Sequence, residues 1–127
     1  MTVEVLGPPV APSRPQIWRI TDRATFDALR RRGRRVRQGP LTLTWLAPAP
    51  TEVGVPPRIA FAVGKHAGGA VVRNRIRRRL RAVCRELVAA GDLPGGAYLM
   101  GANATVATMP WSELVALVRA TVAAASR

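Results

Sequence analysis

Arginines are the side chains of this sequence whose type and spacing point most clearly to chemistry. Residues 71–85 contain seven arginines and no acidic residue. The apolar residues of this region follow helical spacing and form one face: Val72, Ile76, Leu80, Val83 and Leu87. Five arginines fall on the opposite side: Arg73, Arg77, Arg78, Arg81 and Arg85. Guanidinium groups bind phosphate bidentately, and like charges crowded on one helix repel each other. The pattern therefore predicts a polyanion-binding helix, with nucleic acid as the leading candidate.

Residues suited to catalysis by the polypeptide itself are few and scattered. The seven acidic residues are Glu4, Asp22, Asp27, Glu52, Glu86, Asp92 and Glu113. No two of them lie on one predicted element at the spacing of metal ligands, and His66 is the only histidine, so we expect neither a metal site nor a catalytic residue in the chain. His66 could act as a lone base, but a hydrogen-bond donor or a solvent-exposed loop residue is the simpler interpretation.

Composition supports a small basic globular protein. The chain has 127 residues, 48% of them hydrophobic, and a formal net charge of +13. Lys65 is the only lysine, and codon usage in a GC-rich genome would explain the preference for arginine, although not the total charge. Most basic residues fall in residues 30–37 and 71–85. The single cysteine, Cys84, excludes an intrachain disulfide and is expected to be a small buried residue. No membrane span or secretory signal is apparent, so we predict a cytoplasmic protein.

The chain divides into a predicted flexible, Pro-rich arm at residues 1–16 and a single domain at residues 17–127. Helices are expected at 22–32, 70–90 and 110–125, and strands at 41–45, 58–63 and 97–102. Thr21 and Thr108 are candidate N-caps, and Gly33 is the candidate end of the first helix. This order, α-β-β-α-β-α, predicts an α+β fold in the form of a small α-β sandwich.

Alternation along two strands separates the predicted sheet into two faces. The apolar face carries Leu41, Leu43, Trp45, Ile59, Phe61 and Val63. The other face carries only small side chains, those of Thr42, Thr44, Ala60 and Ala62. Such a shallow floor, with Lys65 and His66 at its edge, would accommodate a single nucleic-acid strand. Phe26 either stacks on a base there or anchors the first helix in the core.

Residues 61–78, Phe-Ala-Val-Gly-Lys-His-Ala-Gly-Gly-Ala-Val-Val-Arg-Asn-Arg-Ile-Arg-Arg, resemble the signature of the bacterial ribonuclease P protein subunit. The most specific part is Arg73-Asn74-Arg75 followed by the basic pair Arg77-Arg78, in a strand–loop–helix context. The resemblance extends from about Trp18 to Val122, and includes Phe26 and the Arg30–Gly33 end of the first helix.

The resemblance implies a protein that assembles with a large catalytic RNA, and the complex removes the 5′ leader from precursor tRNA. It also implies that Mg²⁺ is held mainly by the RNA, that the protein alone is inactive, that no small-molecule substrate is involved, and that the fold contains a left-handed βαβ crossover. The residues expected to contact the catalytic RNA are Arg73, Asn74, Arg75, Arg77, Arg78 and Arg81. The residues expected to line the leader-binding cleft are Phe26, Arg30, Thr42, Thr44, Ala60, Ala62, Lys65 and His66.

Two positions depart from the family pattern, and alternatives remain open. Arg30 stands where the family often has a second aromatic residue, and Asn103 stands where a basic residue often follows the last strand. Asn74 could bind a base edge or cap local backbone. A generic basic RNA-binding or chaperone-like module is the main alternative function. A DNA-binding module is the weakest, because base recognition usually uses more varied side chains than a nearly all-arginine surface.

Overall fold

The computed structural model describes residues 17–127, so the predicted arm at residues 1–16 lies outside the described part of the chain. The strands are β1 (Trp18–Arg19), β2 (Arg34–Gln38), β3 (Leu41–Leu46), β4 (Arg58–Ala62) and β5 (Ala97–Ala102). The helices are α1 (Arg23–Arg32), α2 (Ala70–Ala90), α3 (Thr105–Thr108) and α4 (Trp111–Ala125). Short 3-10 turns cover Pro50–Glu52 and Lys65–Ala67. The α+β class expected from the sequence is confirmed.

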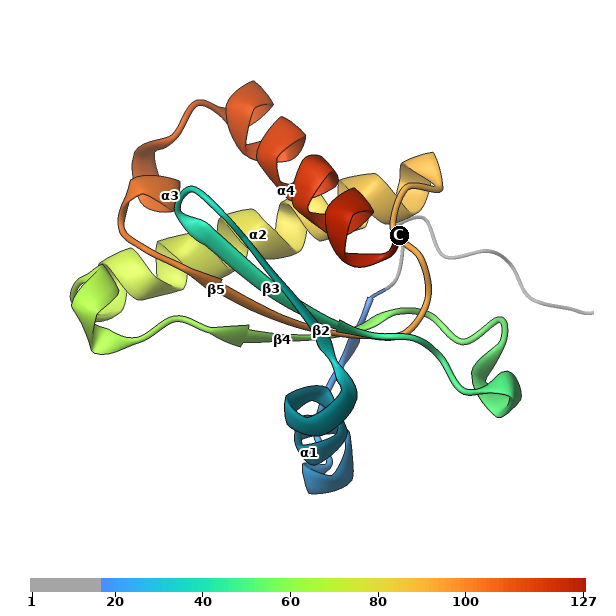
Figure 1. Ribbon diagram of the computed structural model, residues 1–127. Coiled ribbons are helices and arrows are strands. Elements are labelled where there is room, and N and C mark those ends of the chain that lie inside the picture. The colour runs from blue at the N-terminus through green and yellow to red at the C-terminus, as the bar shows by residue number, and fades with distance from the viewer. Residues whose placement is uncertain (1–16) are drawn as a thin grey trace, which may run out of the picture.

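All five strands form one mixed sheet in the order β1-β4-β5-β3-β2. β1, β4 and β5 run parallel, whereas β3 is antiparallel to both β5 and β2. The parallel neighbours β4 and β5 are joined through α2, which makes a βαβ crossover; its left-handedness stays what the resemblance implies. This connection places the long basic helix across one face of the sheet (Figure 1).

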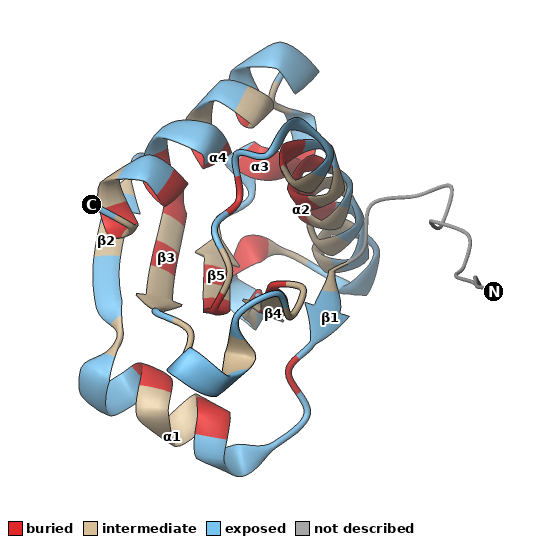
Figure 2. Ribbon diagram, turned by 90° about the vertical axis from the view of Figure 1, so that its right-hand side faces the viewer, coloured by how far each residue is buried: buried red, intermediate tan, exposed pale blue. Residues whose placement is uncertain are grey.

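The main core lies between the sheet and the two longer helices, α2 and α4, which cover the same face (Figures 1 and 2). Leu41, Leu43 and Ile59 point into it from the strands, as their alternation predicted. The apolar face of α2 is buried through Ile76, Leu80, Val83 and Leu87, while Val72 at its beginning is half-buried. Burial of each large aliphatic side chain contributes on the order of 2 kcal/mol, so this face fixes the orientation of α2 and therefore of its arginines.

α1 covers only one end of the opposite sheet face. It contacts β3 and β5 and encloses a second, smaller core whose buried residues are Ile20, Leu29 and Ala97. Phe26 and Ala60 are partly buried against this cluster. Because α1 is short and lies below the sheet in Figure 1, the remainder of this face is left uncovered by any helix.

The two N-caps expected from the sequence are wrong, whereas the expected end of α1 at Gly33 is confirmed. Asp22, not Thr21, caps α1: its Oδ2 atom accepts from the Thr25 hydroxyl at 2.7 Å and from the Thr25 N–H at 2.9 Å, and these bonds lower the pKa of Asp22. Gly33 ends the helix, donating its N–H to the Leu29 carbonyl at 2.9 Å. Thr108 lies within α3, and α4 begins after Pro110 without a side-chain cap.

Three elements were missing from the sequence prediction: β1, β2 and α3. β2 contains a single apolar residue, Val36, and becomes a strand because it pairs with β3 through the two-residue turn Gly39-Pro40. Gly39 has a φ of +55°, a conformation that a glycine adopts easily at the first central position of such a hairpin turn. β1 and α3 have two and four residues, which is too short for a periodic pattern.

Candidate nucleic-acid interface

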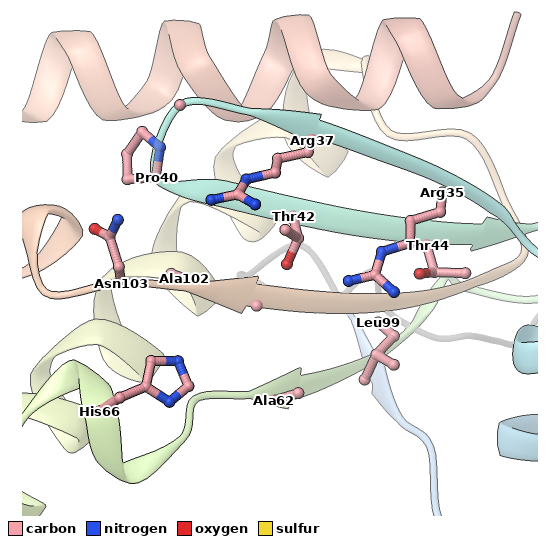
Figure 3. A pocket seen from close by; sticks show the side chains of 12 residues that line it. Arg35, Arg37, Pro40, Thr42, Thr44, Ala62, His66, Leu99, Ala102 and Asn103 are labelled. Atoms are coloured by element: carbon pink, nitrogen blue, oxygen red, sulfur yellow. The ribbon is translucent and has the colours of Figure 1, made fainter.

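The uncovered part of the sheet forms a groove of about 380 Å³, which we call the sheet groove (Figure 3). Its lining comes from β2, the β2–β3 turn, β3, β4, β5 with the residue that follows it, and the 3-10 turn before α2. The lining residues are Arg35, Arg37, Gly39, Pro40, Thr42, Thr44, Ala62, His66, Leu99, Gly101, Ala102 and Asn103. The register of the strands explains why these side chains lie on the same face of the sheet. Arg37 pairs with Thr42 and Arg35 with Thr44, and side chains of paired residues share a face.

The floor of the groove is low because a glycine lies at its centre. Gly101 pairs with Thr42 on one side and with Ala62 on the other. A Cβ atom at Gly101 would lie 2.6 Å from the Thr42 hydroxyl oxygen and 3.3 Å from the Ala62 carbonyl oxygen. Any side chain at this position would therefore collide with the floor and raise it.

The rim of the groove is cationic. Arg35 and Arg37 are exposed, and they make no hydrogen bond or ion pair with the residues that the structure describes. Their guanidinium groups extend over β3, whereas His66 and Asn103 lie on the other sides of the groove (Figure 3). No acidic residue is among the described lining residues. The groove therefore offers guanidinium, hydroxyl, imidazole and amide groups to a bound chain, with no carboxylate to repel an anion.

Only part of the predicted cleft lies in this groove. Thr42, Thr44, Ala62 and His66 line it, but Ala60 packs against the small core and is not a lining residue. Lys65 is exposed on the neighbouring 3-10 turn and is not a lining residue.

Phe26 and Arg30, the two predicted cleft residues on α1, are also outside the groove. Phe26 is half-buried and packs against the small core, where it anchors the first helix. Arg30 is exposed and forms an ion pair with Asp27 within the same helix. Helix α1 stabilises the Ala60–Leu99 end of the sheet through the small core, and none of its own residues is among the groove lining.

Sequence reasoning did not assign Arg35, Arg37 or Asn103 to the site, and it named Asn103 only as a departure from the family pattern. The signal was present in the alternation Arg35-Val36-Arg37, in which the middle residue packs on the main core. A strongly charged five-residue segment does not resemble a strand by propensity, so only its pairing with β3 reveals which arginines face the groove.

The arginines of α2 fall into two groups, because several are held by the protein itself. Arg75 donates its Nε to the Ala107 carbonyl at 2.7 Å, and Arg79 donates to the carbonyls of Val106 and Met109 at 2.5 Å each. The last carbonyls of a helix have no partner within it, so these guanidinium groups complete the end of α3. Removal of Arg75 or Arg79 would therefore leave carbonyls at the end of α3 without these donors.

The other α2 residues predicted to bind RNA differ in exposure. Asn74 and Arg78 are exposed, whereas Arg73, Arg77 and Arg81 are half-buried. Arg77 donates to the Asn74 amide oxygen at 3.0 Å, and the guanidinium carbon of Arg81 lies 5.4 Å from the centre of the Phe61 ring. Thus the Asn74 amide already has a partner on its own helix, and Arg78 is the most available cation of the set.

The charge of α2 is not neutralised within the part of the chain that the structure describes. The ion pairs there join Asp27 to Arg30, Asp22 and Glu52 to Arg58, and Asp92 to Arg119. None involves an arginine of α2. Cys84, on the inner side of the helix, is buried as expected, and burial raises the pKa of its thiol to about 12.

Among residues 17–127, no three or more His, Cys, Asp or Glu side chains gather in a way that would hold a metal ion. No helix within this range is long and apolar enough to cross a membrane.

Comparison with known proteins gives one consistent result. The family model described as Ribonuclease P matches residues 15–126. A ribonuclease P protein component from Thermobifida fusca (strain YX) is 40% identical over 114 residues, covering 86% of this chain and 76% of that protein. One from Nocardioides sp. (strain ATCC BAA-499 / JS614) is 39% identical over 97 residues, covering 72% and 80%.

Solved structures show the same fold. The Staphylococcus aureus RNase P protein superimposes with a TM-score of 0.69 at 19% identity, covering 85% of this chain and 94% of that one. The Thermotoga maritima RNase P protein gives a TM-score of 0.66 at 15% identity, covering 82% and 94%. The family match and the relatives of about 40% identity extend over most of the domain that carries the groove and the basic helix, and the chain belongs to the ribonuclease P protein component family.

Proposed function

We propose that this chain is the protein subunit of a ribonuclease P and assists a catalytic RNA in the endonucleolytic removal of the 5′ leader from precursor tRNA. The observation that carries the proposal is the family match over residues 15–126, which includes both cationic surfaces. A cytoplasmic location fits this role and remains a prediction.

The two surfaces suggest a division of labour. The sheet groove binds the single-stranded leader: Arg35 and Arg37 donate to its phosphates, and Thr42, His66 and Asn103 offer further hydrogen bonds. The low floor at Gly101 lets the backbone of a strand approach the sheet closely. Single strands are commonly bound by such cationic channels, which follow the sugar–phosphate backbone and tolerate many sequences.

The exposed side of α2 binds the catalytic RNA. Arg78 and Asn74 are its most accessible members, and Arg73, Arg77 and Arg81 contribute charge from half-buried positions. Arg75 has a mixed role, since it is exposed but donates to the Ala107 carbonyl. Helix α2 is rigidly seated through its buried apolar face, so its cations are positioned before RNA arrives, and less conformational entropy is lost on binding.

Mg²⁺ does not fit a site in the described residues, which lack a cluster of acidic or histidine ligands. We therefore assign the metal ions of the reaction to the RNA. In this proposal the polypeptide orients the leader and the RNA and supplies no general acid or base. His66 is the only histidine and is exposed at the end of the groove, where it serves as a hydrogen-bond donor.

Reconstitution tests the proposal. The full chain is mixed with the matching ribonuclease P RNA and a precursor tRNA labelled at its 5′ end, at a Mg²⁺ concentration where the RNA alone is slow. We expect release of the intact leader by the mixture, and none by the protein without RNA. Cleavage by the protein alone would contradict the assignment of catalysis to RNA.

The same assay separates the alternative functions. A generic RNA-binding or chaperone-like module would bind unrelated structured RNAs equally well and would not accelerate leader removal. A DNA-binding module would be displaced from the ribonuclease P RNA by duplex DNA. Tight binding that resists both competitors, together with faster leader removal, supports the proposed function.

A further inference from the structure

A second hollow, separate from the sheet groove, lies between α2 and the first residue of α4. It has a volume of about 340 Å³ and is lined by Arg75, Arg78, Arg79, Ala82 and Trp111. The four α2 residues follow helical spacing and form one stripe along that helix. Trp111 faces this stripe from the beginning of α4 and is 39% exposed, which is unusual for so large an aromatic side chain.

The indole ring of Trp111 is held in place although it is exposed. The guanidinium carbon of Arg79 lies 5.7 Å from the ring centre, and Arg79 is itself fixed by its bonds to the Val106 and Met109 carbonyls. On another side, the indole Nε1 donates to a carboxylate oxygen of Glu86 at 3.3 Å. A fixed aromatic ring loses little conformational entropy when a flat ligand stacks on it.

The remaining lining supplies space and charge. Ala82 is exposed, and its methyl group leaves room beside the ring. Arg78 is exposed and makes no hydrogen bond or ion pair within residues 17–127. No carboxylate is part of the described lining, and the nearby Glu86 is engaged with the indole N–H. An aromatic face next to a free guanidinium suits a nucleotide, whose base stacks and whose phosphate accepts hydrogen bonds.

We propose that Trp111 and Arg78 form a binding site for one unpaired nucleotide of the RNA that contacts α2, with the base against the indole beside Ala82 and a phosphate on Arg78. A base inside a helix is stacked on both sides, so only an unpaired base presents a free face to the ring. This inference depends on the proposed function for the identity of the RNA, and it adds a recognition residue, Trp111 of α4, that belongs neither to the sheet groove nor to the Arg73-Asn74-Arg75 motif.

Substitutions that leave the net charge unchanged test the site. Ala82→Leu fills the hollow, Trp111→Leu removes the aromatic face, and Trp111→Phe retains one. Affinity of the full chain for ribonuclease P RNA is measured at several salt concentrations. Stacking of one base predicts binding about five- to 150-fold weaker for the first two variants, and binding close to that of the unmodified protein for Trp111→Phe. Ala89→Leu, at an exposed position of α2 outside the hollow, is the matched control.

Each outcome is informative about this site or about the proposed function. If Ala82→Leu and Trp111→Leu bind as tightly as the unmodified protein, or if Ala89→Leu weakens binding equally, the nucleotide site is refuted. If Trp111→Leu shifts the urea midpoint, the exposed position Ala82 decides the question. Failure of the unmodified protein to bind or stimulate the RNA would instead contradict the proposed function. Chemical probing should further reveal an RNA base that the unmodified protein protects and Ala82→Leu does not.

Discussion

Replacing both Arg35 and Arg37 by glutamine should weaken binding of the leader without affecting the fold. Both side chains line the sheet groove from β2, and neither has a hydrogen bond or ion pair within the described residues. Exposed substitutions of this kind change the free energy of unfolding by less than about 0.5 kcal/mol. Glutamine keeps much of the length and polarity, so the double variant isolates the two positive charges.

The size of the effect follows from counterion release. Each cation that neutralises a phosphate of a single strand adds about 0.7 to the slope of log affinity against log salt, so two add about 1.4. Between about 50 mM and 200 mM salt, leader binding by the unmodified protein should therefore fall about sevenfold more than leader binding by the variant. At the lower salt concentration the variant should already bind the leader more weakly.

Binding of the reconstituted complex to precursor tRNA and to tRNA without a leader measures this effect. The difference between the two salt slopes belongs to the leader, and it should be smaller by about 1.4 in the variant. Arg34→Gln is the matched control, because Arg34 is the preceding residue of the same strand but donates to the Arg127 carbonyl at 2.6 Å and does not line the groove. Equal losses for both tRNAs, or an equal effect of Arg34→Gln, would refute the assignment of the groove to the leader.

Two further predictions concern the folded protein itself. Arg79→Gln should lower the free energy of unfolding, measured in urea, by about 2 kcal/mol, because it removes charged donors from the carbonyls of Val106 and Met109. The control Arg78→Gln should change this free energy by less than about 0.5 kcal/mol. Similar values for the two variants would contradict the division of the α2 arginines into held and available groups. Because burial raises the pKa of Cys84 to about 12, its thiol should resist alkylation at about pH 8 in the native protein and should react once urea unfolds the chain. Mass spectrometry measures the extent of alkylation. Rapid labelling of the native protein would show that the core opens at this position.

Sequence periodicity was sufficient for the elements that bury a regular apolar face. The stripe Ile76, Leu80, Val83 and Leu87 predicted α2, and alternation at residues 41–45 predicted which side chains of β3 enter the core. The residues of β5 were also predicted with the observed limits, 97–102. These predictions succeed because the buried face of each of these elements is formed by residues that are close together along the chain.

The groove and the roles of individual arginines depend on contacts between distant segments. Arg35 and Arg37 acquire a common face only because β2 pairs with β3, and Asn103 joins them because β5 is the other neighbour of β3. Phe26 lies in the small core because α1 folds onto the end of the sheet, a placement that its sequence neighbours do not specify.

The sequence by itself determined that the chain carries a rigid, strongly basic helix beside a sheet with one face of small residues, and the family to which that motif is similar. Only the tertiary structure decided which of these cations have hydrogen-bond partners within the protein. Arg75 and Arg79 are adjacent to Arg78 in the same pattern, yet they meet carbonyls of α3 about thirty residues further along the chain, as the sequence separations of 32 and 27 show. The sequence shows at which positions of a helix the arginines lie, whereas the packing of the whole fold decides which groups their guanidinium ions contact.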